Sequence, residues 1–351
     1  MPTNFPLRNR AVDCFGETSN SPLVSVIILN YNGERFLSDC VSSVLDSNYK
    51  NLEVLVVDNG SIDESADQLA TMFKHERRLR VLFNGKNLGY AAGSNRGIQE
   101  SRGDYVMLLN NDTVVEQHCI GEIIQTMKTQ INIGAAQPKT LLMTKRDTID
   151  STGGFIDRFG YSVTRGHLQA DSSEYDSVCE VFYVSSAAMY PRNIFGETGL
   201  FDESYFILNE DVDLCWRIRL AGCRVIYVPH ATVYHHVSAT LGHNPIGEIM
   251  WHLRRNRIST VVKNYSLMNA VKALMVLLFL YNVTFVKELF ISRDLQRAAS
   301  NLRAVSSNLV GLRSLMIRRG EVQTRCRKVS DAEIVKHMSP VPVFLQLLRE
   351  K

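Results

Sequence analysis

The sequence predicts an α/β protein, in which a mixed, mostly parallel sheet of Rossmann-like type is followed by a helical C-terminal region. Short apolar, β-branched runs alternate four times with segments of helical periodicity in the first 130 residues. Polar residues gather directly after each of these apolar runs. Beyond residue 246 only helical and long apolar patterns occur. Strands alternating with helices over short connections are typical of right-handed βαβ units.

Composition indicates a folded protein and excludes several classes. The chain has 351 residues, 45% of them apolar and 21% charged, which suits one large domain with an appendage or two domains. Its net charge of +3 gives no support for nucleic acid as a partner. The seven cysteines are scattered, odd in number and without a Cys-x-x-Cys pair, so no disulfide framework is expected and a reducing cytoplasm fits best.

Three regions are expected along the chain. Residues 1–22 form a polar arm without the apolar core of a signal peptide, residues 23–245 form the α/β domain, and residues 246–351 form the helical region. Within the domain four buried strands are predicted, at Leu23–Leu29, Leu52–Val57, Leu79–Phe83 and Tyr105–Leu109. Helices are expected after each strand, from about Phe36, from Ser61 or Asp63, and from about Gly89 and Glu116.

The pattern changes in the second half of the domain. Lys145–Ser177 is polar and contains glycines, as substrate-selecting insertions often do. Glu210–Ala221 is predicted to be a helix with acids in its first turn and Gly222 at its end. Two short strands are expected at Val225–Val228 and Thr232–Tyr234.

The polar residues after the strands predict a binding site. The carboxyl ends of parallel strands share one edge of a sheet, and ligands of open α/β sheets bind there. Asp112, on the turn after the fourth strand, could hold a hard divalent cation or could cap the next helix, and both interpretations remain open. Asparagine is also a common turn residue, so each asparagine has a structural alternative.

Six sequence blocks together resemble the family 2 inverting glycosyltransferases. The resemblance covers Leu23 to Gly242 in family order, and it is closest to the rhamnosyltransferase-like enzymes of bacterial polysaccharide assembly. It implies the GT-A nucleotide-diphospho-sugar transferase fold. The blocks are Leu23–Gly33, Val56–Ser61, Asn87–Gly97, Leu108–Thr113, Phe201–Arg217 and Val233–Thr240.

The resemblance implies roles for residues of the donor site. Asp58 matches the residue that contacts the nucleobase, and its carboxylate could accept a uracil or thymine imide N–H. Asp112 matches the second acid of the Asp-x-Asp metal motif, with Asn110 in place of the first, which implies a weak Mg²⁺ or Mn²⁺ site completed by the donor pyrophosphate. The other implied donor-binding residues are Asn30, Asn32, Asn59, Asn87, Gly89, Asn95 and Asn111.

Two further matches concern the metal and the general base. His235 matches a histidine that completes the metal shell; its neighbour His236 should face the other way on a strand. Glu210 and Asp211 match the acidic pair of the family, in which Asp211 would be the base that deprotonates the acceptor hydroxyl. Asp213 is expected to cap the helix or to pair with Arg217.

The implied function is transfer of one sugar, with inversion, from a UDP- or dTDP-sugar such as dTDP-rhamnose. The acceptor would be a saccharide or an isoprenoid-diphosphate-linked glycan of the cell surface. A catalytically inactive nucleotide-sugar binding protein or scaffold of the same fold is the alternative, because Asn110 departs from the metal motif.

The C-terminal region suggests contact with a membrane. Leu267–Ile291 is apolar but interrupted by Lys272, Asn282 and Lys287, so an interfacial helix is favoured over a spanning or a buried one. Arg293–Lys328 carries nine basic and two acidic residues, which suits a peripheral site on the inner face of the plasma membrane. Leu295, Ala298, Leu302, Val305, Leu309, Leu312 and Met316 fall at heptad spacing, which leaves a homodimer open.

Overall fold

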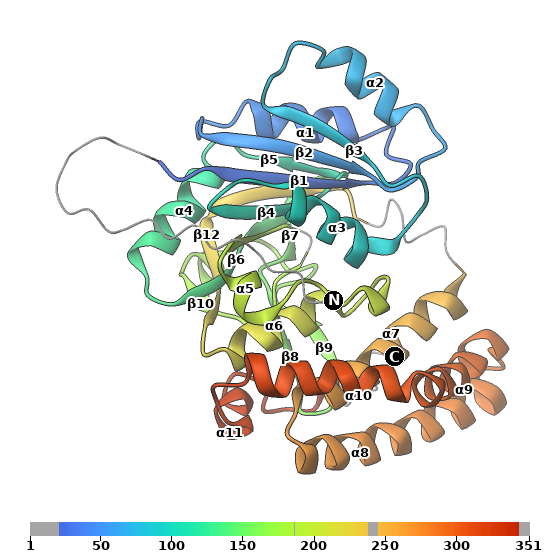
Figure 1. Ribbon diagram of the computed structural model, residues 1–351. Coiled ribbons are helices and arrows are strands. Elements are labelled where there is room, and N and C mark those ends of the chain that lie inside the picture. Colours follow the sequence, from blue (N-terminus) through green and yellow to red (C-terminus); the bar gives the residue numbers. More distant parts are fainter. Residues whose placement is uncertain (1–20, 186, 238–244, 344–351) are drawn as a thin grey trace.

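The protein is built around a ten-stranded mixed sheet with helices on both faces (Figure 1). The computed structural model describes residues 21–185, 187–237 and 245–343, so nearly all of the predicted N-terminal arm lies outside the described residues. The strand order is β10-β12-β6-β11-β4-β1-β2-β3, with β5 paired to β12 and β7 paired to β6. Strands β8 and β9 form a separate hairpin.

The strands have the following bounds. They are β1 Val24–Asn30, β2 Leu52–Asp58, β3 Leu79–Phe83, β4 Tyr105–Asn110, β5 Thr113–Val115, β6 Ile133–Leu142, β7 Lys145–Ser151, β8 Gly154–Ile156, β9 Ser162–Thr164, β10 Cys179–Glu180, β11 Ala187–Pro191 and β12 Arg224–His235. The helices are α1 Leu37–Leu45, α2 Ser65–Met72, α3 Gly89–Glu100, α4 Cys119–Thr129, α5 Ile194–Thr198, α6 Glu210–Leu220, α7 Ile246–Asn264, α8 Leu267–Val286, α9 Leu295–Val310, α10 Leu312–Glu321 and α11 Asp331–Val335.

The four predicted strands form the parallel part of the sheet. β1 lies between β2 and β4, with Asn30 level with Asp58 in the first pair and Leu29 level with Asn110 in the second. Strands buried on both faces are continuous apolar runs, and β1 and β2 have that composition. The polar residues that follow these strands therefore share one edge of the sheet.

The rest of the sheet mixes directions. β11 is antiparallel to both of its neighbours, β4 and β6, so a late segment of the chain lies beside the fourth strand. The two strands predicted at Val225–Val228 and Thr232–Tyr234 are one strand, β12, whose register shifts between Val228 and Thr232. The fold class is as predicted, with a mixed sheet and a helical C-terminal region.

Each face of the sheet has its own apolar core. Helices α1 and α4 cover one face, where Val41 and Ile120 are fully buried against the strands. Helices α3 and α6 cover the other face, where Trp216 is fully buried. The six described cysteines are all free.

The C-terminal helices pack on the second face, as Figure 1 shows, with α7 next to α6 and α8 at the margin farthest from the sheet. α8 continues as a π-helical turn over Lys287–Ile291. The heptad-spaced run predicted from Leu295 to Met316 is not one helix, because the chain is divided into α9 and α10 at Gly311.

Candidate active site

A carboxylate and an imidazole face each other at the carboxyl edge of the sheet. Asp112 follows β4, and its Oδ1 lies 3.1 Å from Nε2 of His235, at the end of β12. Both residues are buried. The chain continues from Asp112 directly into β5, and α4 begins only at Cys119. Asp112 therefore caps no helix, which removes the structural alternative.

The second nitrogen of His235 is held by a residue that the sequence did not single out. Its Nδ1 lies 2.8 Å from Oδ2 of Asp150, at the end of β7. The Asn110 side-chain amide lies 3.5 Å from Nε2. Burial lowers the pKa of His235, but the hydrogen bonds with Asp112 and Asp150 outweigh it and raise the pKa to about 9. The His236 ring instead packs on Phe36, with ring centroids 4.6 Å apart.

The side chains of Asp112 and His235 provide only some of the ligands that a divalent cation needs. A carboxylate and an imidazole suit Mn²⁺, and a carboxylate on the far nitrogen is the usual support for a metal-binding histidine. However, among the described residues no group of three or more His, Cys, Asp or Glu is arranged to hold a metal ion. Asp112 and His235 would therefore hold a cation only together with ligands from a bound substrate.

Asn30 joins two other predicted donor-binding residues, Asp58 and Asn111. It is fully buried; its Nδ2 donates to Asp58 at 3.0 Å and to Ser65 at 2.8 Å, and its Oδ1 accepts from Asn111 at 2.8 Å. Asp58 also accepts from the backbone N–H groups of Gly60 and Ser61. In this structure Asn30 thus positions Asp58 and Asn111 rather than facing solvent.

The next loops of the same edge are also tied together. Asn59 donates to Asn87 Oδ1 at 3.0 Å and to the carbonyl of Gly89 at 3.2 Å. Asn32 is exposed and accepts from the N–H of Ile62 at 2.9 Å. Asn95 is buried and exchanges two hydrogen bonds with the backbone of Phe201, so it fastens α3 to the segment that precedes α6.

The segment before α6 brings the acidic pair to the same edge. Phe206, Leu208 and Asn209 all have positive φ, at 62°, 69° and 67°, which non-glycine residues rarely adopt. Such strain clusters at functional sites. The carbonyl of Phe206 accepts from the N–H of Ala91 in the first turn of α3. A Cβ on Gly89 would lie 2.5 Å from the Phe206 ring, so only glycine fits there.

Glu210 and Asp211 begin α6 in a low-polarity environment. Burial raises the pKa of Asp211 to about 6, and burial with the nearby Asp211 charge raises that of Glu210 further above its usual value. The Glu210 Oε2 atom is buried and has no hydrogen-bond partner among the described residues. Tyr90 and Tyr183 lie close enough for the Asp211 charge to contribute, after burial, to raising their hydroxyl pKa values.

Helix α7 of the C-terminal region holds the strained segment in place. The side-chain amide of Asn256 donates to the carbonyls of Tyr205, Ile207 and Leu208, at 3.0, 2.8 and 2.7 Å. Asn256 is 1% exposed. The helical region is therefore part of the scaffold that positions Glu210 and Asp211.

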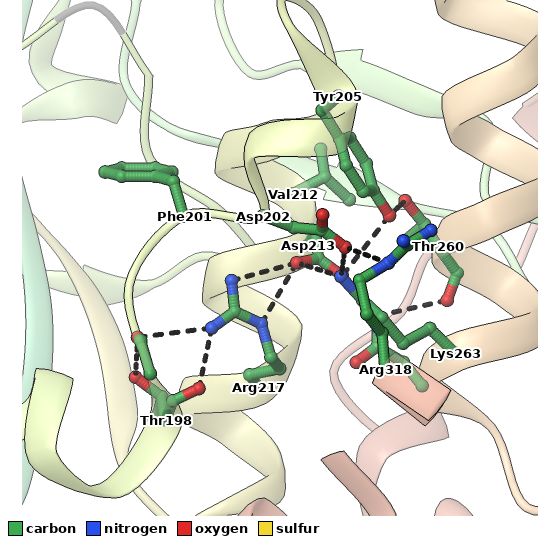
Figure 2. Close-up of polar contacts among 12 residues, drawn as sticks. Thr198, Phe201, Asp202, Tyr205, Val212, Asp213, Arg217, Thr260, Lys263 and Arg318 are labelled. Carbon is green, nitrogen blue, oxygen red and sulfur yellow. Dashed lines mark hydrogen bonds and ion pairs between the residues drawn. The ribbon is translucent and has the colours of Figure 1, made fainter. Parts of the chain in front are cut away.

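The third acid of α6 has a structural role, as predicted. Asp213 is fully buried and pairs with Arg217 at 2.9 Å and with Lys263 of α7 at 2.8 Å (Figure 2). Lys263 also pairs with Asp202 at 2.6 Å, and Arg318 of α10 reaches the same carboxylate at 3.0 Å. These ion pairs join α6, α7 and α10 directly behind the acidic pair.

Comparison with known proteins identifies the domain. The model of the glycosyl transferase family 2 matches residues 25–195. The matched residues are just under half of the chain, and over them the chain is similar to this family. An uncharacterized glycosyltransferase of Haemophilus influenzae is 26% identical over 61% of this chain and 65% of its own length. The poly-beta-1,6-N-acetyl-D-glucosamine synthase of Staphylococcus aureus is 25% identical over 62% of this chain and 51% of its own length.

Solved structures show the same fold as the glycosyltransferase domain and its surroundings. GalNAc-T7 with UDP, GalNAc and Mn²⁺ superimposes with a TM-score of 0.60 at 15% identity, over 84% of this chain and 58% of the other. S. aureus TarS 1-349 in complex with UDP-GlcNAc gives 0.56 at 14% identity, over 86% and 87%. The predicted glycosyltransferase and its GT-A fold are confirmed; the rhamnosyltransferase-like subgroup stays a prediction. The chain spans at most 65% of the length of these curated relatives. The reaction of the whole protein is therefore a proposal, which follows below.

Proposed function

We propose that this protein transfers one sugar, with inversion, from a nucleotide-diphospho-sugar to an acceptor used in cell-surface polysaccharide synthesis. The observation that carries the proposal is the acidic pair of buried Glu210 and partly buried Asp211, held beside the first turn of α3 on the sheet edge where Asp112 and His235 also lie. The family match and the poly-GlcNAc synthase relative support this class of reaction.

Asp211 is the proposed general base. The acceptor hydroxyl oxygen attacks the anomeric carbon while Asp211 takes the hydroxyl proton, and the bond from that carbon to the diphosphate oxygen breaks. The nucleoside diphosphate leaves and the configuration inverts in this single displacement. A base works best when its pKa lies near the working pH, and burial has moved the pKa of Asp211 to about 6. One carboxylate suffices, because the nucleoside diphosphate leaves without protonation, whereas a glycosidase needs a second carboxyl group to protonate its leaving oxygen.

Asp112 and His235 are the proposed protein ligands of Mg²⁺ or Mn²⁺. With two protein ligands the remaining positions would be filled by the donor diphosphate and water, which is the usual way in which proteins hold these ions with phosphates. When bound, the ion would offset the negative charge that develops on the leaving diphosphate. GalNAc-T7, one of the structural neighbours, was solved with Mn²⁺, which supports a divalent cofactor.

The proposed donor is a UDP- or dTDP-sugar, with dTDP-rhamnose as one candidate. Asp58 keeps one acceptor position free after its three hydrogen bonds, and that position could take an imide N–H of the base. The TarS neighbour was solved with UDP-GlcNAc. The proposed acceptor is a saccharide, free or carried on an isoprenoid diphosphate.

A donor screen tests this proposal. Thermal unfolding should shift upward with one class among UDP-, dTDP- and GDP-sugars, and the shift should require Mn²⁺ or Mg²⁺, because a ligand stabilises the state that it binds. Hydrolysis of that donor would establish an enzyme. Binding without any hydrolysis or transfer would favour the alternative, an inactive binding protein or scaffold, which Asn110 keeps open because it replaces an acid of the metal motif.

A further inference from the structure

Helix α8 carries a stripe of large apolar side chains on its outward face. Their spacing of three or four residues places them on one side of the helix, including its π-helical end. Each side chain is between 47% and 69% exposed, although apolar residues of this size are normally buried. The α8 stripe consists of Met268, Val271, Met275, Phe279, Val283, Val286 and Phe290.

The opposite face of α8 packs on the protein. Ala270, Ala273, Leu277 and Tyr281 are buried, and the Tyr281 hydroxyl donates to the carbonyl of Arg254 in α7 at 3.1 Å. The buried face of α8 is therefore already accounted for, and the α8 stripe is its solvent-exposed face. A contiguous apolar surface of this kind marks a site that contacts a partner or a membrane.

Both ends of α8 are fixed to the same body. At its start, Ser266 and Asn269 donate to the Asp331 carboxylate at 2.9 and 2.7 Å. At its end, Glu288 accepts from Arg254 at 2.6 Å and from Asn301 of α9 at 2.7 Å. In a helix that spans a membrane, the two ends lie on opposite sides of a hydrocarbon layer about 30 Å thick. Leu267–Ile291 is long and apolar enough to span, but these contacts hold it lengthwise against α7 and α9.

Unpaired cations accompany the α8 stripe. The side chains of Lys272, Lys287 and Arg293 have no hydrogen bond or ion pair with any residue in the described part of the chain. The nearby acids are engaged, since Glu288 binds Arg254 and Asp294 caps α9. Apolar side chains flanked by free lysine and arginine are the pattern of helices that lie in the interface of anionic membranes.

We propose that the α8 stripe binds an anionic membrane surface, with the helix lying in the plane of the membrane and not crossing it. The protein is then a peripheral membrane protein, and α7 connects the docked helix to the segment before Glu210 through Asn256. If the proposed transfer reaction holds, this docking would present the acidic pair to an acceptor carried by a lipid. The membrane contact itself does not depend on that reaction.

Vesicle co-sedimentation with the whole protein tests the proposal. The wild type should sediment with phosphatidylglycerol-containing vesicles more than with pure phosphatidylcholine vesicles. The double variant Met275→Glu/Phe279→Glu should lower this binding on the order of tenfold or more, because it puts two charges into the apolar face. Ile62→Glu and Ile131→Glu are matched controls on exposed apolar residues, at 92% and 83%, far from α8 in sequence, and should bind as the wild type does.

A charge variant keeps the test decisive if the double variant fails to fold. Lys272→Gln/Lys287→Gln/Arg293→Gln leaves the α8 stripe intact and should remove the preference for phosphatidylglycerol. Unchanged vesicle binding by a folded double variant would overturn the proposal. Absence of vesicle binding by the wild type, with a dimer in light scattering that the double variant makes monomeric, would overturn it too and assign the stripe to a second copy of the chain.

Discussion

The carboxylate of Asp150 lies 2.8 Å from Nδ1 of His235, while Nε2 of the same ring lies 3.1 Å from Asp112. A bound cation would displace the proton that Nε2 shares with Asp112, and the carboxylate on Nδ1 would keep the other ring proton in place. Asp150 comes from the segment expected to be a substrate-selecting insertion, and its chemistry was not foreseen. We assign it as a positioning residue for the proposed metal site.

Asp150→Ala should weaken Mn²⁺ binding by about 10- to 100-fold, the usual effect of losing the partner of a metal-binding histidine. The affinity can be measured by electron paramagnetic resonance of free Mn²⁺ in the presence of the nucleotide. Asp147→Ala is the matched control, because Asp147 is an exposed aspartate of the same strand. Equal Mn²⁺ affinity in the wild type and Asp150→Ala would show that Asp150 does not support a metal ligand.

Asn256→Ala should slow the proposed transfer more than it weakens donor binding. The substitution leaves three carbonyls of the strained segment without their donor, so Glu210 and Asp211 lose their fixed position. A shift of about 1 Å can cost about 100-fold in rate. Steady-state kinetics would separate kcat from KM. Asn308→Ala is the control, since Asn308 bonds the backbone of α7 at Arg255 but not the segment. A kcat equal to that of the wild type would refute this role.

Asp213→Ala should destabilise the protein by about 3–5 kcal/mol, because removing one partner leaves Arg217 and Lys263 charged and buried. Urea unfolding followed by circular dichroism measures the loss. Burial raises the pKa of Asp213, but Lys263 and Arg217 outweigh it and lower the pKa below its usual value. The stabilisation is therefore complete above about pH 4 and is lost as the pH falls further.

The control for that measurement is an exposed ion pair. Arg96 and Glu100 are 3.4 Å apart on α3, and both side chains are at least 40% exposed. Glu100→Ala should change the free energy of unfolding by less than about 1 kcal/mol. If Asp213→Ala were no more damaging than Glu100→Ala, the buried network would not support α6.

The pH dependence of the reaction should follow the pKa of Asp211. Burial raises this pKa to about 6, so the carboxylate is protonated, and unable to act as a base, below that pH. The value of kcat/KM should rise tenfold per pH unit below pH 6 and become constant above it, as expected for one essential base. If kcat/KM instead fell only below about pH 4, the base would be a carboxyl group with an unshifted pKa.

The sequence predicted the parallel strands because burial on both faces leaves a visible apolar run, as in Val24–Asn30. It placed Asp112 on the carboxyl edge, because parallel strand ends meet there, and the family resemblance assigned His235 to the same site. It could not show Asp150, whose role depends on β7 pairing with β6 and not on any local pattern. Nor could it show that Asn30 is buried, since a turn asparagine and a buried one have the same neighbours in sequence.

The C-terminal region was predicted only in outline. Its helical periodicity was correct, but a heptad pattern does not reveal the turn at Gly311 that divides α9 from α10. The bonds from Asn256 and Lys263 to the segment and helix that carry the acidic pair are long-range contacts between polar residues. Such contacts leave no periodic signal in the chain.

Turnover of the donor by Asp211→Asn tests the central claim most directly. The variant keeps the shape of the side chain, and it should be at least as stable as the wild type at neutral pH, because a carboxyl group whose pKa is raised by folding costs stability when it ionises. With the sugar nucleotide found in the screen, and Mn²⁺ present, Asp211→Asn should bind the donor with the affinity of the wild type. It should show no transfer and no hydrolysis. Turnover at the rate of the wild type would contradict the assignment of Asp211 as the base.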